Sequence, residues 1–257
     1  MALVEARFVV CLLGTWKSFD AVATAVNHAV APGFTVDAEH SHLSPDERMG
    51  RAFDASKDRV LPSFHEGDDQ AVAGHESVAY VLSPHIDPSS AFDVAARVLA
   101  VISAAFEVGA TAVKVDSSCI THGRQRWLAL ATGARKAQGD PQELAPILRE
   151  AFVRRPILDS EDGVYYTCGM HLLGRRDVEL SEDVPAIVSV ALLDAAAERV
   201  LAAPPRSDLE GAALAVDDLD MQLTDGGDGE RYEIDDFLYN PHGYYAVVPA
   251  GTLDDDA

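Results

Sequence analysis

The sequence predicts one α+β domain, residues 1–257, in which amphipathic helices pack on a mixed β-sheet. Three units, roughly residues 1–76, 77–160 and 161–257, each show a strand, a helix and a strand in that order. The strands are short and rich in β-branched residues, and the helices repeat apolar residues along one face. Three long helices are too few to cover both faces of a fully parallel sheet. An α+β sandwich is therefore favoured, and a mixed α/β sheet with helices on one face and a duplicated ferredoxin-like arrangement stay open.

The middle unit has the clearest pattern. Residues 78–82 are expected to form a short apolar strand, and Ser89 or Ser90 can cap the helix that follows it. Gly109 supplies a left-handed end to the helix, and residues 111–115 form the second strand. The apolar face of the helix consists of Phe92, Ala95, Leu99, Ile102 and Phe106. A unit of this length buries its helix against a sheet.

The first unit repeats this plan in smaller form. Residues 8–13 are expected to form a strand, and Ser18 to cap a helix that runs through Val30 to Pro32. A further strand starts at residues 34–36. Residues 37–76 are polar, and we expect loops there around a short helix near residues 45–53.

The rest of the chain gives weaker signals. Residues 124–130 are expected to form a strand that carries Trp127, and Asp140 to start a helix at Pro141. The third unit is expected to contain strands at 156–158 and 164–168, a helix capped by Asp183 that ends near Leu201, and a closing strand at 212–216.

The charge of the chain restricts its partners. The formal net charge is −22, and the part from residue 207 to 257 contains fourteen acidic residues and one basic residue, Arg231. Nucleic acid and anionic membranes are excluded as partners because phosphate binding requires a basic surface. An acidic surface fits a basic protein partner, although it also serves plain solubility.

The three cysteines, Cys11, Cys119 and Cys168, have no metal-type spacing and lie in or beside apolar strand segments. Cysteine in such segments behaves as a small hydrophobic residue, so we expect a reducing, cytoplasmic location and no cofactor. The N-terminal residues fit a strand better than a signal peptide, and charged residues interrupt every apolar run before it reaches membrane-spanning length.

His40 and His42 are the best metal candidates. Alternation in an extended segment places both imidazoles on one side, with Asp37 nearby and His65 or His75 as a third ligand. No recognised metal motif supports this arrangement, and a solvated histidine-containing loop is favoured over it.

The segment after residues 111–115 contains a possible thiol site. Cys119 and His122 could pair as nucleophile and base, but no third group is visible to orient the histidine, so structural roles are favoured. Polar groups that follow strands can also converge in one cleft. In that arrangement Trp16, His85, Ser117 and His171 would line a ligand pocket together with Cys119 and His122.

Two segments resemble a bacterial family, the domain of unknown function 4261. They are Gly-Ala-Thr-Ala-Val-Lys-Val-Asp-Ser-Ser, from Gly109 and continuing to Trp127, and Tyr-Thr-Cys-Gly-Met-His-Leu-Leu-Gly-Arg-Arg-Asp-Val-Glu-Leu, from Tyr166. The order of elements agrees over roughly residues 8–248. The resemblance implies an α/β fold, and it implies an immunity or accessory role of the kind found in bacterial conflict systems. The family has no established activity, so no catalytic residue is carried over.

The sequence favours a non-catalytic protein that binds a basic protein partner through its acidic C-terminal part. The alternatives are a metal-dependent hydrolase around His40 and His42 and a thiol enzyme at Cys119 and His122. A sensor that holds a small ligand in the strand-end cleft is a further possibility.

Overall fold

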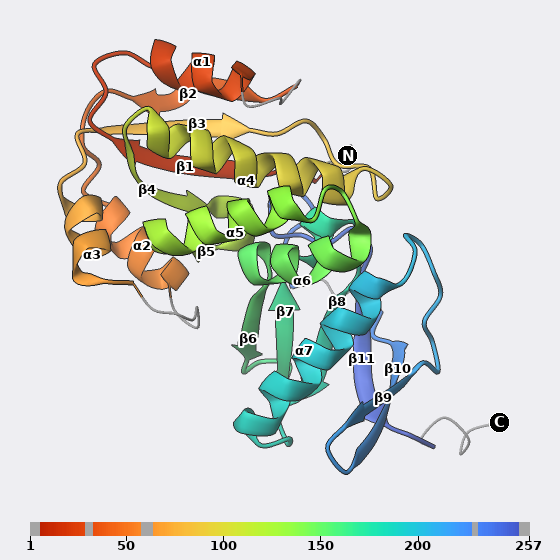
Figure 1. Ribbon diagram of the computed structural model, residues 1–257. Helices are drawn as coiled ribbons and strands as arrows, with labels where there is room; N and C mark the ends of the chain where they lie inside the picture. Colours follow the sequence, from red (N-terminus) through yellow and green to blue (C-terminus); the bar gives the residue numbers. More distant parts are fainter. Residues whose placement is uncertain (1–5, 29–32, 58–63, 228–230, 252–257) are drawn as a thin grey trace.

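The computed structural model describes residues 6–28, 33–57, 64–227 and 231–251, and it confirms the α+β class. The strands are divided between two sheets, each with helices packed on it (Figure 1). Within the described residues, no helix has both the length and the apolar character needed to cross a membrane.

The first sheet is antiparallel and has the strand order β2-β3-β1-β4-β5. Its strands are β1 (Val9–Gly14), β2 (Thr35–His42), β3 (Ser77–Leu82), β4 (Ala110–Val115) and β5 (Ile120–Thr121). The central strand β1 is buried from Val10 to Gly14, since both faces of the sheet are covered.

Two sets of helices cover this sheet. Helices α1 (Asp20–His28), α4 (Ala91–Glu107) and α5 (Arg124–Lys136) lie on one side (Figure 1). Val10 and Leu12 pack into the core on that side, whereas Cys11 and Leu13 point to the opposite face. Helices α2 (Met49–Lys57) and α3 (Glu66–Ala73) cover the opposite face through Met49, Phe53 and Val72.

The second sheet has the order β6-β7-β8-β11-β10-β9 and is mixed, because β8 and β11 run parallel. Its strands are β6 (Arg154–Asp159), β7 (Val164–Cys168), β8 (Asp177–Ser181), β9 (Ala213–Val216), β10 (Leu219–Asp225) and β11 (Tyr244–Pro249). Helix α7 (Ala186–Ala202) packs on one face.

The other face of the second sheet carries an aromatic cluster organised by Arg231. The guanidinium of Arg231 lies 4.8 Å and 4.7 Å from the ring centres of Tyr166 and Tyr244. It also binds the carboxylates of Glu179 at 2.8 Å and Asp159 at 3.2 Å. The single basic residue of the acidic C-terminal part is therefore a structural side chain.

Helix α6 (Pro141–Phe152) lies where the two sheets meet, and one core of buried residues continues from the first sheet into the second. Phe8 packs edge-on against Phe152, with ring centres 4.8 Å apart. Two short 3₁₀ turns, Asp116–Ser118 and Met170–Leu173, are also buried at this junction.

Several sequence predictions need correction. Residues 124–130 belong to helix α5, because Trp127, Leu130, Ala131 and Ala134 form a buried helical face. Pro185 rather than Asp183 occupies the N-cap of α7. The predicted closing strand is β9, and β10 and β11 follow it.

Other predicted elements agree with the structure or lie outside its description. Asp140 caps α6 by accepting a hydrogen bond from the Gln142 backbone N–H at 2.8 Å, as expected. The predicted end of the first helix at Val30 and Pro32 falls outside the described residues.

Candidate functional site

The two histidines of β2 have local partners, and His40 is exposed whereas His42 is half-buried. His40 Nδ1 lies 2.9 Å from Asp37 Oδ2, and His42 Nδ1 lies 2.9 Å from the Ser44 carbonyl oxygen. His75 is buried, and its Nε2 accepts a hydrogen bond from the Asp46 backbone N–H. Over the described ranges, no three His, Cys, Asp or Glu side chains are grouped in a way that could hold a metal.

Cys119 and His122 are held by different backbone groups. The Cys119 thiol contacts the Asp116 carbonyl oxygen at 3.7 Å, and His122 Nε2 lies 3.3 Å from the Ala151 carbonyl oxygen. Burial raises the pKa of the Cys119 thiol and lowers the pKa of His122 to about 4. A catalytic thiol needs a lowered pKa, so this environment opposes nucleophilic chemistry.

The four residues predicted to line a strand-end pocket do not converge in one cleft. Ser117 and His171 are fully buried at the junction between the sheets, where Ser117 Oγ accepts a hydrogen bond from the Val9 N–H at 3.1 Å. His171 Nε2 lies 3.1 Å from the Phe237 carbonyl oxygen. Trp16 is buried and donates to the Val108 carbonyl oxygen at 2.8 Å, whereas His85 is exposed in the loop after β3.

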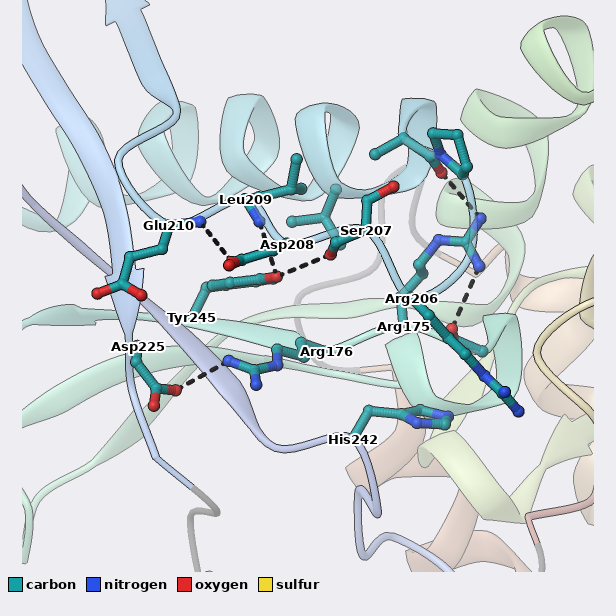
Figure 2. A pocket seen from close by; sticks show the side chains of 14 residues that line it. Arg175, Arg176, Arg206, Ser207, Asp208, Leu209, Glu210, Asp225, His242 and Tyr245 are labelled. Carbon is teal, nitrogen blue, oxygen red and sulfur yellow. Dashed lines mark hydrogen bonds and ion pairs between the residues drawn. The ribbon is translucent and has the colours of Figure 1, made fainter.

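A different set of residues forms a cavity of about 400 Å³ on the second sheet (Figure 2). Three arginines and one histidine from three separate segments line it. Arg175 and Arg176 precede β8, Arg206 follows α7, and His242 precedes β11. We call this cavity the arginine pocket.

Arg175 is the most unusual of the four because its residue is only 8% exposed. Its guanidinium donates to the carbonyl oxygens of Gly174 at 3.2 Å and Ala203 at 3.0 Å, and it lies 5.4 Å from the centre of the Phe92 ring. Its Nε has no hydrogen-bond partner, and no carboxylate of the described chain pairs with it. Burial lowers the pKa of Arg175, as expected for a cation without a counter-ion.

Arg206 and Arg176 add positive charge beside Arg175, whereas His242 is held in its neutral form by burial and by these charges. Arg206 is exposed and takes a left-handed backbone conformation with φ of 64°, which is uncommon for residues other than glycine. It forms a long ion pair, in which its Nη2 lies 3.8 Å from Asp87 Oδ2. Burial lowers the pKa of His242, and the charges of Arg175, Arg206 and Arg176 lower it further. The four side chains therefore interact with one another electrostatically.

Carboxylates occupy the other end of the pocket. Figure 2 shows Asp208, Glu210 and Asp225 at one end and Arg175, Arg206 and His242 at the other. Arg176 lies between them and binds Asp225 at 2.8 Å.

The loop that carries the carboxylates is fixed by Tyr245. The Tyr245 hydroxyl accepts a hydrogen bond from the Leu209 N–H and donates one to the Ser207 carbonyl oxygen, both at 3.2 Å. Asp208 Oδ1 accepts a hydrogen bond from the Glu210 N–H at 3.0 Å. The position of both acidic residues is thus set by the fold.

Sequence reasoning missed this pocket. The paired arginines lie within the segment that resembles the bacterial family, but they carried no functional signal by themselves. A scan for basic residues outside the helices would have included Arg175, Arg176 and Arg206, but also others such as Lys114 and Arg231. Comparison with family models, with curated proteins and with solved structures found no match, so the family resemblance stays a prediction.

Proposed function

We propose that this protein is a non-catalytic binding protein and that the arginine pocket holds a small anionic ligand. The buried guanidinium of Arg175, with no carboxylate to pair with it, carries this proposal. Buried arginines are normally paired, because an unpaired charge away from water is costly. A bound anion would supply the missing partner.

Size and charge support this assignment. The cavity of about 400 Å³ lies within the range of small-molecule sites. The net charge of −22 repels anions at long range, so an anion site on this protein needs a local concentration of positive charge. The arginine pocket supplies it through the guanidinium groups of Arg175 and Arg206, whereas Arg176 is paired with Asp225.

Arg206→Gln is expected to weaken anion binding about tenfold, because it removes one charged hydrogen-bond donor from the exposed side of the pocket. Calorimetric titration with inorganic phosphate, pyrophosphate and butyrate measures this effect. Arg135→Gln, which changes an exposed arginine on α5, is the matched control. Equal affinities for wild type and Arg206→Gln, or no binding of any probe to the wild type, would overturn the proposal.

A second candidate function is the binding of a basic protein by the acidic hairpin. We define the acidic hairpin as residues 217–220, which are the turn between β9 and β10 and the first two residues of β10. Asp217, Asp218 and Asp220 are exposed, and Leu219 between them is 41% exposed. An apolar side chain surrounded by carboxylates suits a partner with a basic rim, since complementary charge accelerates and directs association.

Neutralising the acidic hairpin is expected to abolish salt-sensitive partner capture. The variant is Asp217→Asn with Asp218→Asn and Asp220→Asn, and asparagine tolerates the left-handed conformation of Asp217. A matched control neutralises three exposed carboxylates elsewhere, Glu39, Glu47 and Glu107. Native co-purification at low and high salt compares the variants. If both variants capture the partner protein equally well, the acidic hairpin is not its binding site.

A cytoplasmic location and a relationship to the bacterial family belong to the same proposal. The buried free thiols of Cys11 and Cys168 support the first, because they suit a reducing compartment.

A further inference from the structure

The two ends of the arginine pocket carry opposite charges. At the basic end Arg175 has no carboxylate partner among the residues that the structure describes, and Arg206 has a long ion pair, with Asp87 at 3.8 Å. We propose that the ligand is a zwitterion, a molecule with a carboxylate at one end and an ammonium group at the other. Its carboxylate binds at Arg175 and Arg206, and its ammonium group binds at Asp208 and Glu210. This inference rests on the proposed anion-binding function and specifies its ligand.

The acidic end is available to a ligand. Asp208 and Glu210 are exposed, and neither makes an ion pair with a residue that the structure describes. The Tyr245 hydroxyl holds the loop between them through Leu209 and Ser207. Their carboxylates are therefore placed at the pocket without a cation of the chain to neutralise them.

The middle of the pocket is neutral. Arg176 binds Asp225 at 2.8 Å and lies 4.7 Å from the centre of the Tyr245 ring. The charges of Arg176 and Asp225 neutralise each other, so the centre of a ligand does not need a charged group to pair with them. The charges open to a ligand therefore lie at the two ends, with carboxylates on one side and the guanidinium groups of Arg175 and Arg206 on the other (Figure 2). Within the described chain Arg175 has no carboxylate partner, and the Arg206 ion pair with Asp87 is long, at 3.8 Å.

A simple anion fits this distribution less well than a zwitterion. It would pair with Arg175 but would leave Asp208 and Glu210 without a partner, and these carboxylates would repel it. It would also approach against the field of a protein with a net charge of −22, whereas a zwitterion has no net charge. Both the local and the long-range electrostatics thus favour a ligand with two opposite charges.

A series of ω-amino acids tests the proposal, because its members differ only in the spacing of the two charges. The probes are glycine, β-alanine, γ-aminobutyrate and ε-aminocaproate, each compared with the carboxylate of the same chain length that lacks the amino group. We expect one chain length to bind the wild type about tenfold more tightly than its plain carboxylate in calorimetric titration.

Variants at the acidic end are expected to change the affinity for ω-amino acids and for plain carboxylates in opposite directions. Asp208→Asn with Glu210→Gln is expected to weaken binding of the preferred ω-amino acid about tenfold and to strengthen binding of the plain carboxylate, because repulsion is removed. Asp218→Asn with Asp220→Asn, on the acidic hairpin, is the matched control for lost negative charge.

The outcomes separate this inference from the proposed function. If plain carboxylates bind in an Arg206-dependent way but no ω-amino acid gains an advantage, the zwitterion is wrong and the anion site stands. If the advantage persists in Asp208→Asn with Glu210→Gln, the placement of the ammonium group is wrong. If neither carboxylates nor inorganic phosphate bind, both proposals fail.

Discussion

Replacing Gly169 by alanine is expected to destabilise the fold by more than about 4 kcal/mol, enough to prevent folding of many domains. Gly169 has φ of 118°, a conformation that L side chains rarely adopt. A Cβ atom there would lie 2.1 Å from the Phe152 carbonyl oxygen and 3.2 Å from Ser118 Cβ. The carbonyl belongs to the backbone at the end of α6, so it cannot move away as a flexible side chain could.

Gly211→Ala is the matched control for this variant. Gly211 also has a positive φ, of 73°, but nothing lies within 4 Å of the Cβ position. We expect a loss of about 1 kcal/mol there, from backbone strain alone. Denaturant unfolding of both variants measures the difference, and equal stabilities would show that the close approach at Gly169 does not hold the two sheets together.

The clearest part of the fold in the sequence was the middle unit, which the structure shows as β3, α4 and β4. Within each strand and within the helix, the apolar residues recur at the spacing typical of that element. The same residues are buried in the structure, so the local pattern was a reliable guide there. Helix α5 was misinterpreted because Trp127, Leu128 and Leu130 fall within a short window, where a strand and a buried helix look alike.

The second sheet was harder to predict. Strand β8 has the acidic residues Asp177 and Glu179 among its apolar ones, which weakens the strand pattern. Asp177 is buried and accepts hydrogen bonds from Thr167 and Asn240. Glu179 pairs with Arg231 at 2.8 Å. These partners lie far away in the sequence, so no local pattern reveals them.

The site residues show the same limit. Ser117 and His171 were selected because polar groups after strands often face a cleft, but here the second sheet packs against those loops. The arginine pocket combines residues 174–176, 206–210 and 242–245. These segments meet only because β11 pairs with β8 in parallel, and that pairing depends on the complete fold.

The free energy of unfolding is expected to contain an acid-labile contribution from two buried histidines. Burial lowers the pKa of His122 and of His171 to about 4. The unfolded chain takes up protons on both imidazoles near pH 6.5, the ordinary value, whereas the native protein does not until about pH 4. Their contribution to stability is complete above about pH 6.5 and is lost as the pH falls towards 4.

Asp177 is expected to act in the opposite direction. Burial raises its pKa from 3.8 to about 7, although hydrogen bonds from Asn240, Thr167 and the Met170 N–H partly offset this. The native protein therefore keeps a proton that the unfolded chain has released between these two pH values. Asp177 destabilises the fold as the pH rises through this window and opposes the histidines over the range in which they titrate.

Single substitutions separate the two effects through the slope of stability against pH. Between about pH 4 and 6.5, His122→Gln is expected to lower this slope by about 1.4 kcal/mol per pH unit, because the unfolded chain no longer binds one proton more than the native protein at this position. Asp177→Asn is expected to raise the slope by about the same amount, because the native protein no longer binds one proton more than the unfolded chain. Denaturant unfolding at several pH values measures the slopes, which are insensitive to any constant loss of stability in a variant. His28→Gln, an exposed histidine on α1, is the control. A His122→Gln slope equal to that of the wild type would mean that His122 takes up its proton in the native state as readily as in the unfolded chain.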